Sequence, residues 1–110
     1  MDYFILWKAS QRMKQSSERF KDRISDMGER SSRVMHVRPV NFAYKGDNNH
    51  AIQWGLIAEE VAKVMPELVT FDILGVPYGV RYDDLPVILL NELQKLSRRV
   101  TELEAQLLKK

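Results

Sequence analysis

The chain has 110 residues, of which 45% are hydrophobic, so it is long enough for one compact domain and too short for two ordinary ones. It contains no cysteine, which excludes a disulfide framework and any thiolate metal site. Seventeen basic and fifteen acidic residues leave a net charge of only +2, which argues against binding nucleic acid by charge alone.

The apolar run at residues 3–7, which ends at Trp7, is typical of a strand rather than of a ligand platform. It is much too short for a membrane span, and it lacks the basic segment that begins a signal peptide. We therefore expect a soluble protein with no targeting segment and no membrane partner.

Residues 18–37 are predicted to form a bent or broken helix. Phe20, Ile24 and Met27 recur at helical spacing, Gly28 interrupts the pattern, and apolar residues resume at Val34. The basic residues here alternate with acidic ones at helical spacing, which is typical of an exposed face with salt bridges. We expect no nucleic-acid partner.

Two short β-hairpins are predicted in the middle of the chain. The first pairs residues 40–44 with 52–57 across a polar loop, and the second pairs 68–72 with 78–82 across a turn at residues 75–77. Both combine β-branched and aromatic residues with turn-forming residues between them.

A short amphipathic helix is predicted between the hairpins, over residues 58–65. Val61, Val64 and Met65 lie on one face, and Pro66 ends the helix. Glu59 and Glu60 stand at its start, where the helix dipole favours carboxylates, so we interpret them as structural rather than catalytic.

The two histidines, His36 and His50, lie far apart, and neither has a partner at the spacing of metal ligands. We expect surface or structural histidines, no metal site and no cofactor.

The C-terminal segment, residues 83–110, is predicted to be a coiled-coil helix. It begins near Asp83 or Asp84, with an aspartate cap and an early proline at Pro86. Apolar residues recur at alternating steps of four and three, which is a heptad seam. The seam consists of Leu89, Leu93, Leu96, Val100, Leu103 and Leu107.

The charges beside the seam favour a parallel arrangement. With Leu93 at position a, Arg99 falls at g and Glu104 at the following e, and these positions face each other between neighbouring parallel helices. The heptads leave the number of chains open. Burial of a seam side chain contributes roughly 1.5 to 3 kcal/mol, against about 1 to 2 kcal/mol of backbone entropy per ordered residue, so the short coil needs support from the residues before it.

Four segments in order resemble one protein family: residues 16–21 (SSERFK), 37–42 (VRPVNF), 55–61 (GLIAEEV) and 65–69 (MPELV), followed by Tyr82 and the coil. The chain resembles the C-terminal intramolecular chaperone domain, peptidase S74, of phage tail spikes and tail fibres such as endosialidase. The same domain occurs in myelin regulatory factor. The resemblance covers roughly residues 16–110.

The resemblance implies an α+β fold in which short β-hairpins and helices form a small globular part, followed by a long helix in a parallel, trimeric coiled coil. Residues 1–15 are then the end of a preceding stalk segment or a linker, residues 16–82 the globular chaperone part and residues 83–110 the coil. The implied partners are two further copies, in a homotrimer, and the preceding β-rich segment of the same polypeptide. The implied location is the host cytoplasm during virion assembly, with the domain later released from the virion tail or kept in it.

The resemblance also implies a single self-cleavage, with Ser16 as the nucleophile and Lys21 as the base that activates it. Ser17 departs from the family pattern, which usually has aspartate at that position. Without the family, Ser16 or Ser17 is simply a helix N-cap and Lys21 a solvated residue. Two alternatives stay open: a structural trimerisation module that does not cleave, and a DNA-linked regulator resembling myelin regulatory factor.

Overall fold

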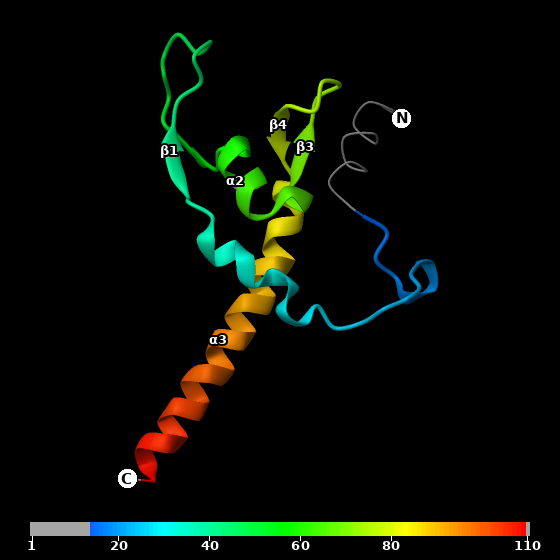
Figure 1. The fold of residues 1–110 in the computed structure, drawn as a ribbon, viewed down its shortest axis with the longest axis vertical. Coiled ribbons are helices and arrows are strands. Elements are labelled where there is room, and N and C mark those ends of the chain that lie inside the picture. The colour runs from blue at the N-terminus through cyan, green and yellow to red at the C-terminus, as the bar shows by residue number, and fades with distance from the viewer. Residues whose placement is uncertain (1–13, 110) are drawn as a thin grey trace, which may run out of the picture.

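The computed structural model describes residues 14–109; the strand predicted around Trp7, and most of the predicted stalk end or linker, lie outside this range. The described fold is α+β, as predicted. A small globular part carries two hairpins at one end, and a long helix projects from the other (Figure 1).

The helix predicted over residues 18–37 is only partly present. A single 3-10 turn, η1 (Glu18–Phe20), and a longer 3-10 helix, η2 (Gly28–His36), are separated by residues without helical structure. The prediction is therefore wrong for residues 21–27. Of the three apolar side chains that suggested a helix there, only Met27 packs against the core, while 53% of Phe20 and 67% of Ile24 are exposed, so little packed surface stabilises one.

Both predicted hairpins are present, with shorter strands. β1 (Val40–Phe42) pairs antiparallel with β2 (Gln53–Gly55), and β3 (Val69–Phe71) pairs antiparallel with β4 (Pro77–Val80). The two hairpins form separate two-stranded sheets, and the second pair has an irregular register beside Thr70.

The core lies where α2 (Ala58–Val64) and the 3-10 turn η3 (Pro66–Leu68) meet η2 and the start of the long helix. The predicted short helix and its end before Pro66 are confirmed. The buried apolar side chains are Val34, Val61, Met65, Leu68, Val69 and Ile88.

The long helix α3 (Leu85–Leu108) follows a 3-10 turn, η4 (Tyr82–Asp84). Asp84 occupies the predicted N-cap position, but its side chain makes no capping hydrogen bond, so that part of the prediction is wrong. Its carboxylate instead accepts a 2.9 Å hydrogen bond from Lys14 Nζ. Within the described part of the chain, the helices are too short or too polar to cross a membrane.

Candidate functional site

Ser16 and Lys21 meet beside η1. The 3-10 turn directs Lys21 back along the chain, and its Nζ atom donates a 2.9 Å hydrogen bond to Ser16 Oγ. Ser17 holds the turn at its other end, since its hydroxyl accepts a 3.4 Å hydrogen bond from the backbone N–H of Arg19. Ser17 therefore fills the N-cap position, where aspartate is equally favoured.

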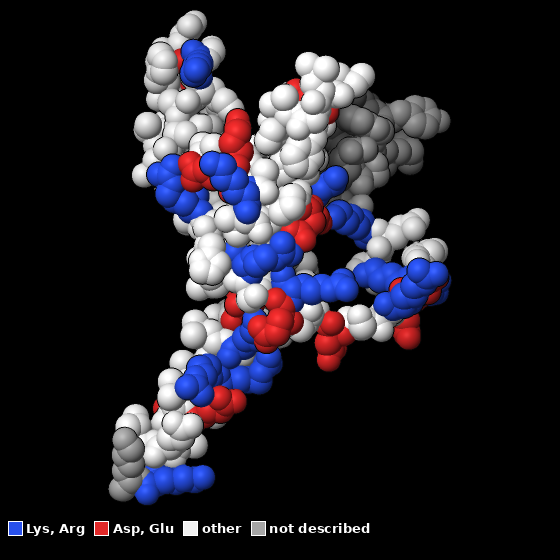
Figure 2. Space-filling view, viewed as in Figure 1, with Lys and Arg blue, Asp and Glu red and all other residues white. Residues whose placement is uncertain are grey.

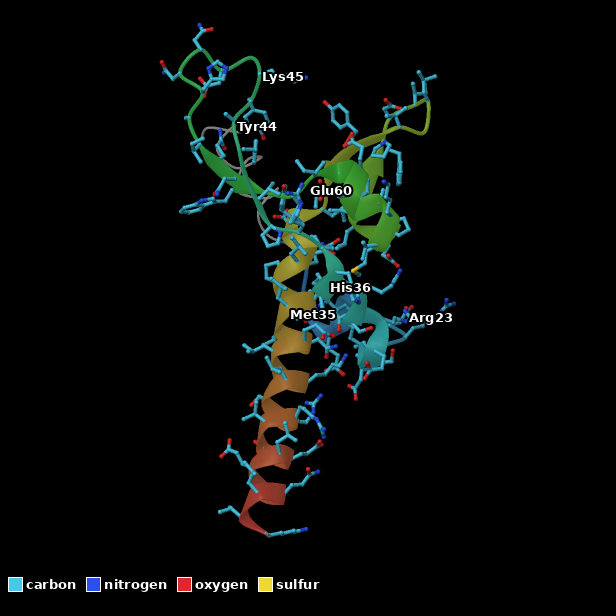
Figure 3. All side chains as sticks on the ribbon, turned by 60° about the vertical axis from the view of Figure 1, so that its left-hand side comes forward. Arg23, Met35, His36, Tyr44, Lys45 and Glu60 are labelled. Carbon is cyan, nitrogen blue, oxygen red and sulfur yellow. The ribbon has the colours of Figure 1, made fainter. Side chains whose placement is uncertain are left out.

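The surroundings of this pair are open. Ser16 and Lys21 are both exposed, and the guanidinium of Arg19 lies 4.6 Å from the centre of the Phe20 ring rather than against the lysine. Arg23, another basic residue of this segment, has a positive φ of 54° and points away from the body of the molecule (Figure 3). A lysine removes a proton only when neutral, and burial or nearby cations favour that form. The described residues of one chain do not provide this burial.

The side of α3 that faces η2 is fixed by a set of polar contacts, which we call the Ser31 network. The Ser31 side chain is almost fully buried; its hydroxyl donates to Glu92 at 2.7 Å and accepts from Asn91 Nδ2 at 2.6 Å. Lys95 Nζ bridges Glu29 and Glu92 at 2.8 and 2.9 Å. This network anchors η2 to α3.

Ionic hydrogen bonds in the network shift two pKa values. The ammonium of Lys95, and then the hydroxyl of Ser31, hold the pKa of the Glu92 carboxyl below its ordinary value. The carboxylates of Glu29 and Glu92 raise the pKa of Lys95. Both shifts favour the charged forms, so the network is complete near neutral pH.

The predicted seam runs beside this network on α3, and Glu92 lies at the border between the two. All six seam side chains are between 43% and 67% exposed, and the part of α3 after Lys95 is solvent-exposed throughout its described length. Arg99 pairs within its own helix with Glu102 at 3.3 Å. The predicted contact of Arg99 with Glu104 is between chains, and a single chain does not test it.

Tyr82 packs closely against Gly55 at the start of residues 55–61, one of the segments that resemble the family. The Tyr82 hydroxyl accepts a 2.9 Å hydrogen bond from the backbone N–H of Leu56, directly after β2. A Cβ atom on Gly55 would lie 2.8 Å from the Tyr82 hydroxyl oxygen and 2.9 Å from the ring of Phe42. The glycine is therefore required by close packing where β2 leads into α2.

The sequence predicted neither nucleic-acid binding nor a metal site. On the face drawn in Figure 2, acidic side chains lie among the basic ones over η2 and α3. His36 and His50 are both exposed, and among residues 14–109 no three His, Asp or Glu side chains cluster where they could hold a metal ion.

Sequence reasoning missed the Ser31 network. Its signal was a second line of residues on α3, in which Ile88, Asn91, Glu92 and Lys95 follow one another at helical spacing beside the seam. Polar residues in such a line look like a solvated face until the partner helix is known.

Comparison with known protein families supports the family resemblance seen in the sequence. Residues 16–70 match the protein family described as peptidase S74, chaperone of endosialidase. The matched range begins at Ser16 and extends through η2, both strands of the first hairpin, α2 and the start of β3. No curated protein matches the chain.

Proposed function

Because the chain belongs to the peptidase S74 family of endosialidase chaperones, we propose that it is an intramolecular chaperone that associates through α3 and then frees itself by one backbone cut beside Ser16. It assists the folding of a preceding β-rich segment of the same polypeptide. Domains of this family belong to trimeric phage proteins, and we propose a parallel homotrimer for this chain as well.

The observation that carries the association is the exposed second half of α3. The helix extends past Lys95 with Leu96, Val100, Leu103 and Leu107 along one stripe and with its described residues exposed. Isolated helices of about 12 to 15 residues are marginal in water, so such a helix gains its stability from a partner that covers the stripe. The apolar positions repeat with the heptad period, so a second α3 is the matching partner.

Cleavage is supported by the 2.9 Å contact between Ser16 Oγ and Lys21 Nζ. In the proposed reaction, neutral Lys21 takes the hydroxyl proton while Ser16 Oγ attacks the carbonyl carbon of an adjacent peptide bond. The amide nitrogen leaves with that proton, an ester remains on Ser16, and one water molecule hydrolyses the ester and restores the hydroxyl.

Trimerisation would link cutting to correct assembly, because neighbouring copies would bury the pair and favour the neutral lysine. The second candidate function is a permanent trimerisation module that does not cleave. The exposure of Ser16 and Lys21 and the presence of Ser17 favour it.

Mass spectrometry of the full chain, with gel filtration and light scattering on the same sample, tests both parts. We expect two fragments whose masses sum to that of the chain plus one water, and their boundary gives the bond that is cut. Ser16→Ala should stay intact, and so should Lys21→Arg, which keeps the charge but replaces the base.

The outcomes separate the alternatives. A wild-type chain that forms a trimer and stays intact supports the permanent module. A chain that is monomeric at every concentration contradicts association through α3. Cleavage at the wild-type rate in monomeric Val100→Asp contradicts the link between assembly and cutting.

A further inference from the structure

Met35 and α3 enclose an apolar groove that the heptad pattern alone does not predict. The groove has a volume of about 400 Å³, and we call it the Met35 groove. Met35 of η2 lines it on one side, and Leu89, Glu92, Leu93, Lys95, Leu96 and Arg99 of α3 line the rest. Figure 3 shows Met35 beside the middle of α3.

Four of the α3 residues that line the groove have the spacing of a coiled-coil socket. In a coiled coil, each seam side chain inserts between four residues of the facing helix, which lie at i, i+3, i+4 and i+7. Leu89, Glu92, Leu93 and Leu96 have this spacing. In a parallel, in-register assembly the side chain opposite this socket is Leu93 of a second copy.

The packing of one chain does not explain why an apolar residue stands at position 35. Its side chain is 68% exposed, while its neighbour Val34 is buried in the core. A methionine is flexible and polarisable and adapts to an apolar partner. Its exposure beside three seam leucines makes the apolar surface continuous from η2 to the seam.

The η2 side of the groove is held in place within one chain. Ser31 anchors η2 to α3, and Lys95 bridges Glu29 of η2 to Glu92 in the socket itself. A surface that is ordered before its partner arrives loses less conformational entropy on binding. The groove is therefore suited to a rigid partner such as a helix.

We propose that the Met35 groove receives α3 of a second copy, with Leu93 of that copy in the socket and Met35 packed against the same helix. This inference rests on the proposed association through α3 and extends it. It makes η2 part of the interface between copies and adds apolar contact where the seam by itself is short.

The absence of cysteine allows a direct test, because Met35→Cys introduces the only thiol in the chain. The rate of its reaction with a maleimide is measured in the oligomer and after dilution to the monomer. We expect the thiol to react at least about tenfold more slowly in the oligomer, a change of about 1.4 kcal/mol in accessibility. Ile73→Cys, on the fully exposed turn between β3 and β4, should react at one rate throughout.

A second pair of variants tests the contribution to binding. Met35→Gln should raise the protein concentration at which half of the oligomer dissociates, since assembly would bury a polar amide in place of the thioether, and Met35→Leu should assemble like the wild type. Circular dichroism of the diluted variants checks that the monomer fold is unchanged.

An oligomer in which the Met35→Cys thiol stays as reactive as in the monomer would overturn this inference and leave the proposed association intact. A chain that never associates would contradict both proposals. Slow labelling together with weaker assembly of Met35→Gln supports the groove as an interface.

Discussion

The Ser31 hydroxyl donates a 2.7 Å hydrogen bond to the Glu92 carboxylate, which joins η2 to α3 across 61 positions of sequence. This contact uses one side of α3 for the chain's own fold and leaves the seam side exposed. One helix therefore serves two purposes: its polar contacts fix the globular part, and its leucines remain available to other copies.

Ser31→Ala should lower the free energy of unfolding by about 1 to 3 kcal/mol, because Asn91 and Glu92 would lose a partner in a partly buried site. Urea unfolding at a single protein concentration measures the change. Ser32→Ala is the matched control, since the Ser32 hydroxyl bonds only to the carbonyl of Glu29 in its own helix. Equal effects of the two variants would contradict a special role for Ser31.

Acid should weaken the Ser31 network. The pKa of Glu92 is lowered by Lys95 and Ser31, so its contribution to stability is present above the ordinary glutamate pKa of 4.5 and is lost as pH falls through the lower folded value. We expect the free energy of unfolding to decrease below about pH 4.5 in the wild type and to decrease less steeply in Glu92→Gln. Superimposable acid profiles for the two proteins would rule out this contribution.

The sequence was informative where local chemistry decides the structure. Proline, glycine and β-branched residues predicted both hairpins and the end of α2 at Pro66, and the leucine spacing predicted α3. The prediction was wrong for residues 21–27, where Phe20 and Ile24 show helical spacing but have no surface to cover them. A segment as short as residues 21–27 does not form a stable helix without a surface that buries its apolar face.

The candidate site likewise combines features that local sequence indicates with features that only tertiary packing produces. The family resemblance singled out Ser16 and Lys21; their Oγ and Nζ atoms lie 2.9 Å apart, and their roles as nucleophile and base stay a prediction. The Ser31 network and the Met35 groove depend on how η2 packs against α3, which no local pattern in either segment specifies. Their residues belong to two segments about 60 positions apart, and only the tertiary fold brings them together.

Gly55→Ala should destabilise the junction of β2 and α2 by about 1 to 3 kcal/mol, because the added methyl group would overlap the Tyr82 hydroxyl and the Phe42 ring. Thermal unfolding followed by circular dichroism measures the loss. Gly46→Ala is the control, since a Cβ atom there meets no atom within 4 Å. A Gly55→Ala protein as stable as Gly46→Ala would show that the junction tolerates the extra volume.

Ser17→Asp should preserve the η1 turn, since aspartate and serine are equally good N-caps, whereas Ser17→Ala removes the hydrogen bond to the Arg19 backbone N–H. If the turn positions Lys21, self-cleavage should continue in Ser17→Asp and slow in Ser17→Ala. The time course of fragment formation on gels compares the two variants. The same rate in both would mean that the cap does not contribute to the reaction.

The predicted pairing of Arg99 with Glu104 between chains can be tested by exchanging their charges. Arg99→Glu places two glutamates opposite each other in a parallel assembly, and Glu104→Arg places two arginines there. Each exposed pair contributes only about 0.2 to 1 kcal/mol, so we expect each single variant to dissociate at a moderately lower temperature, and the double variant to recover most of the loss.

Two controls complete this charge exchange. Arg99→Glu also removes the 3.3 Å contact with Glu102 inside the helix, and Glu102→Gln measures that part separately. A mixture of the two single variants should form mixed oligomers in preference to pure ones, because only mixed neighbours place opposite charges at these positions. In an antiparallel assembly g residues face g residues and e residues face e residues, so the double variant would not recover the loss.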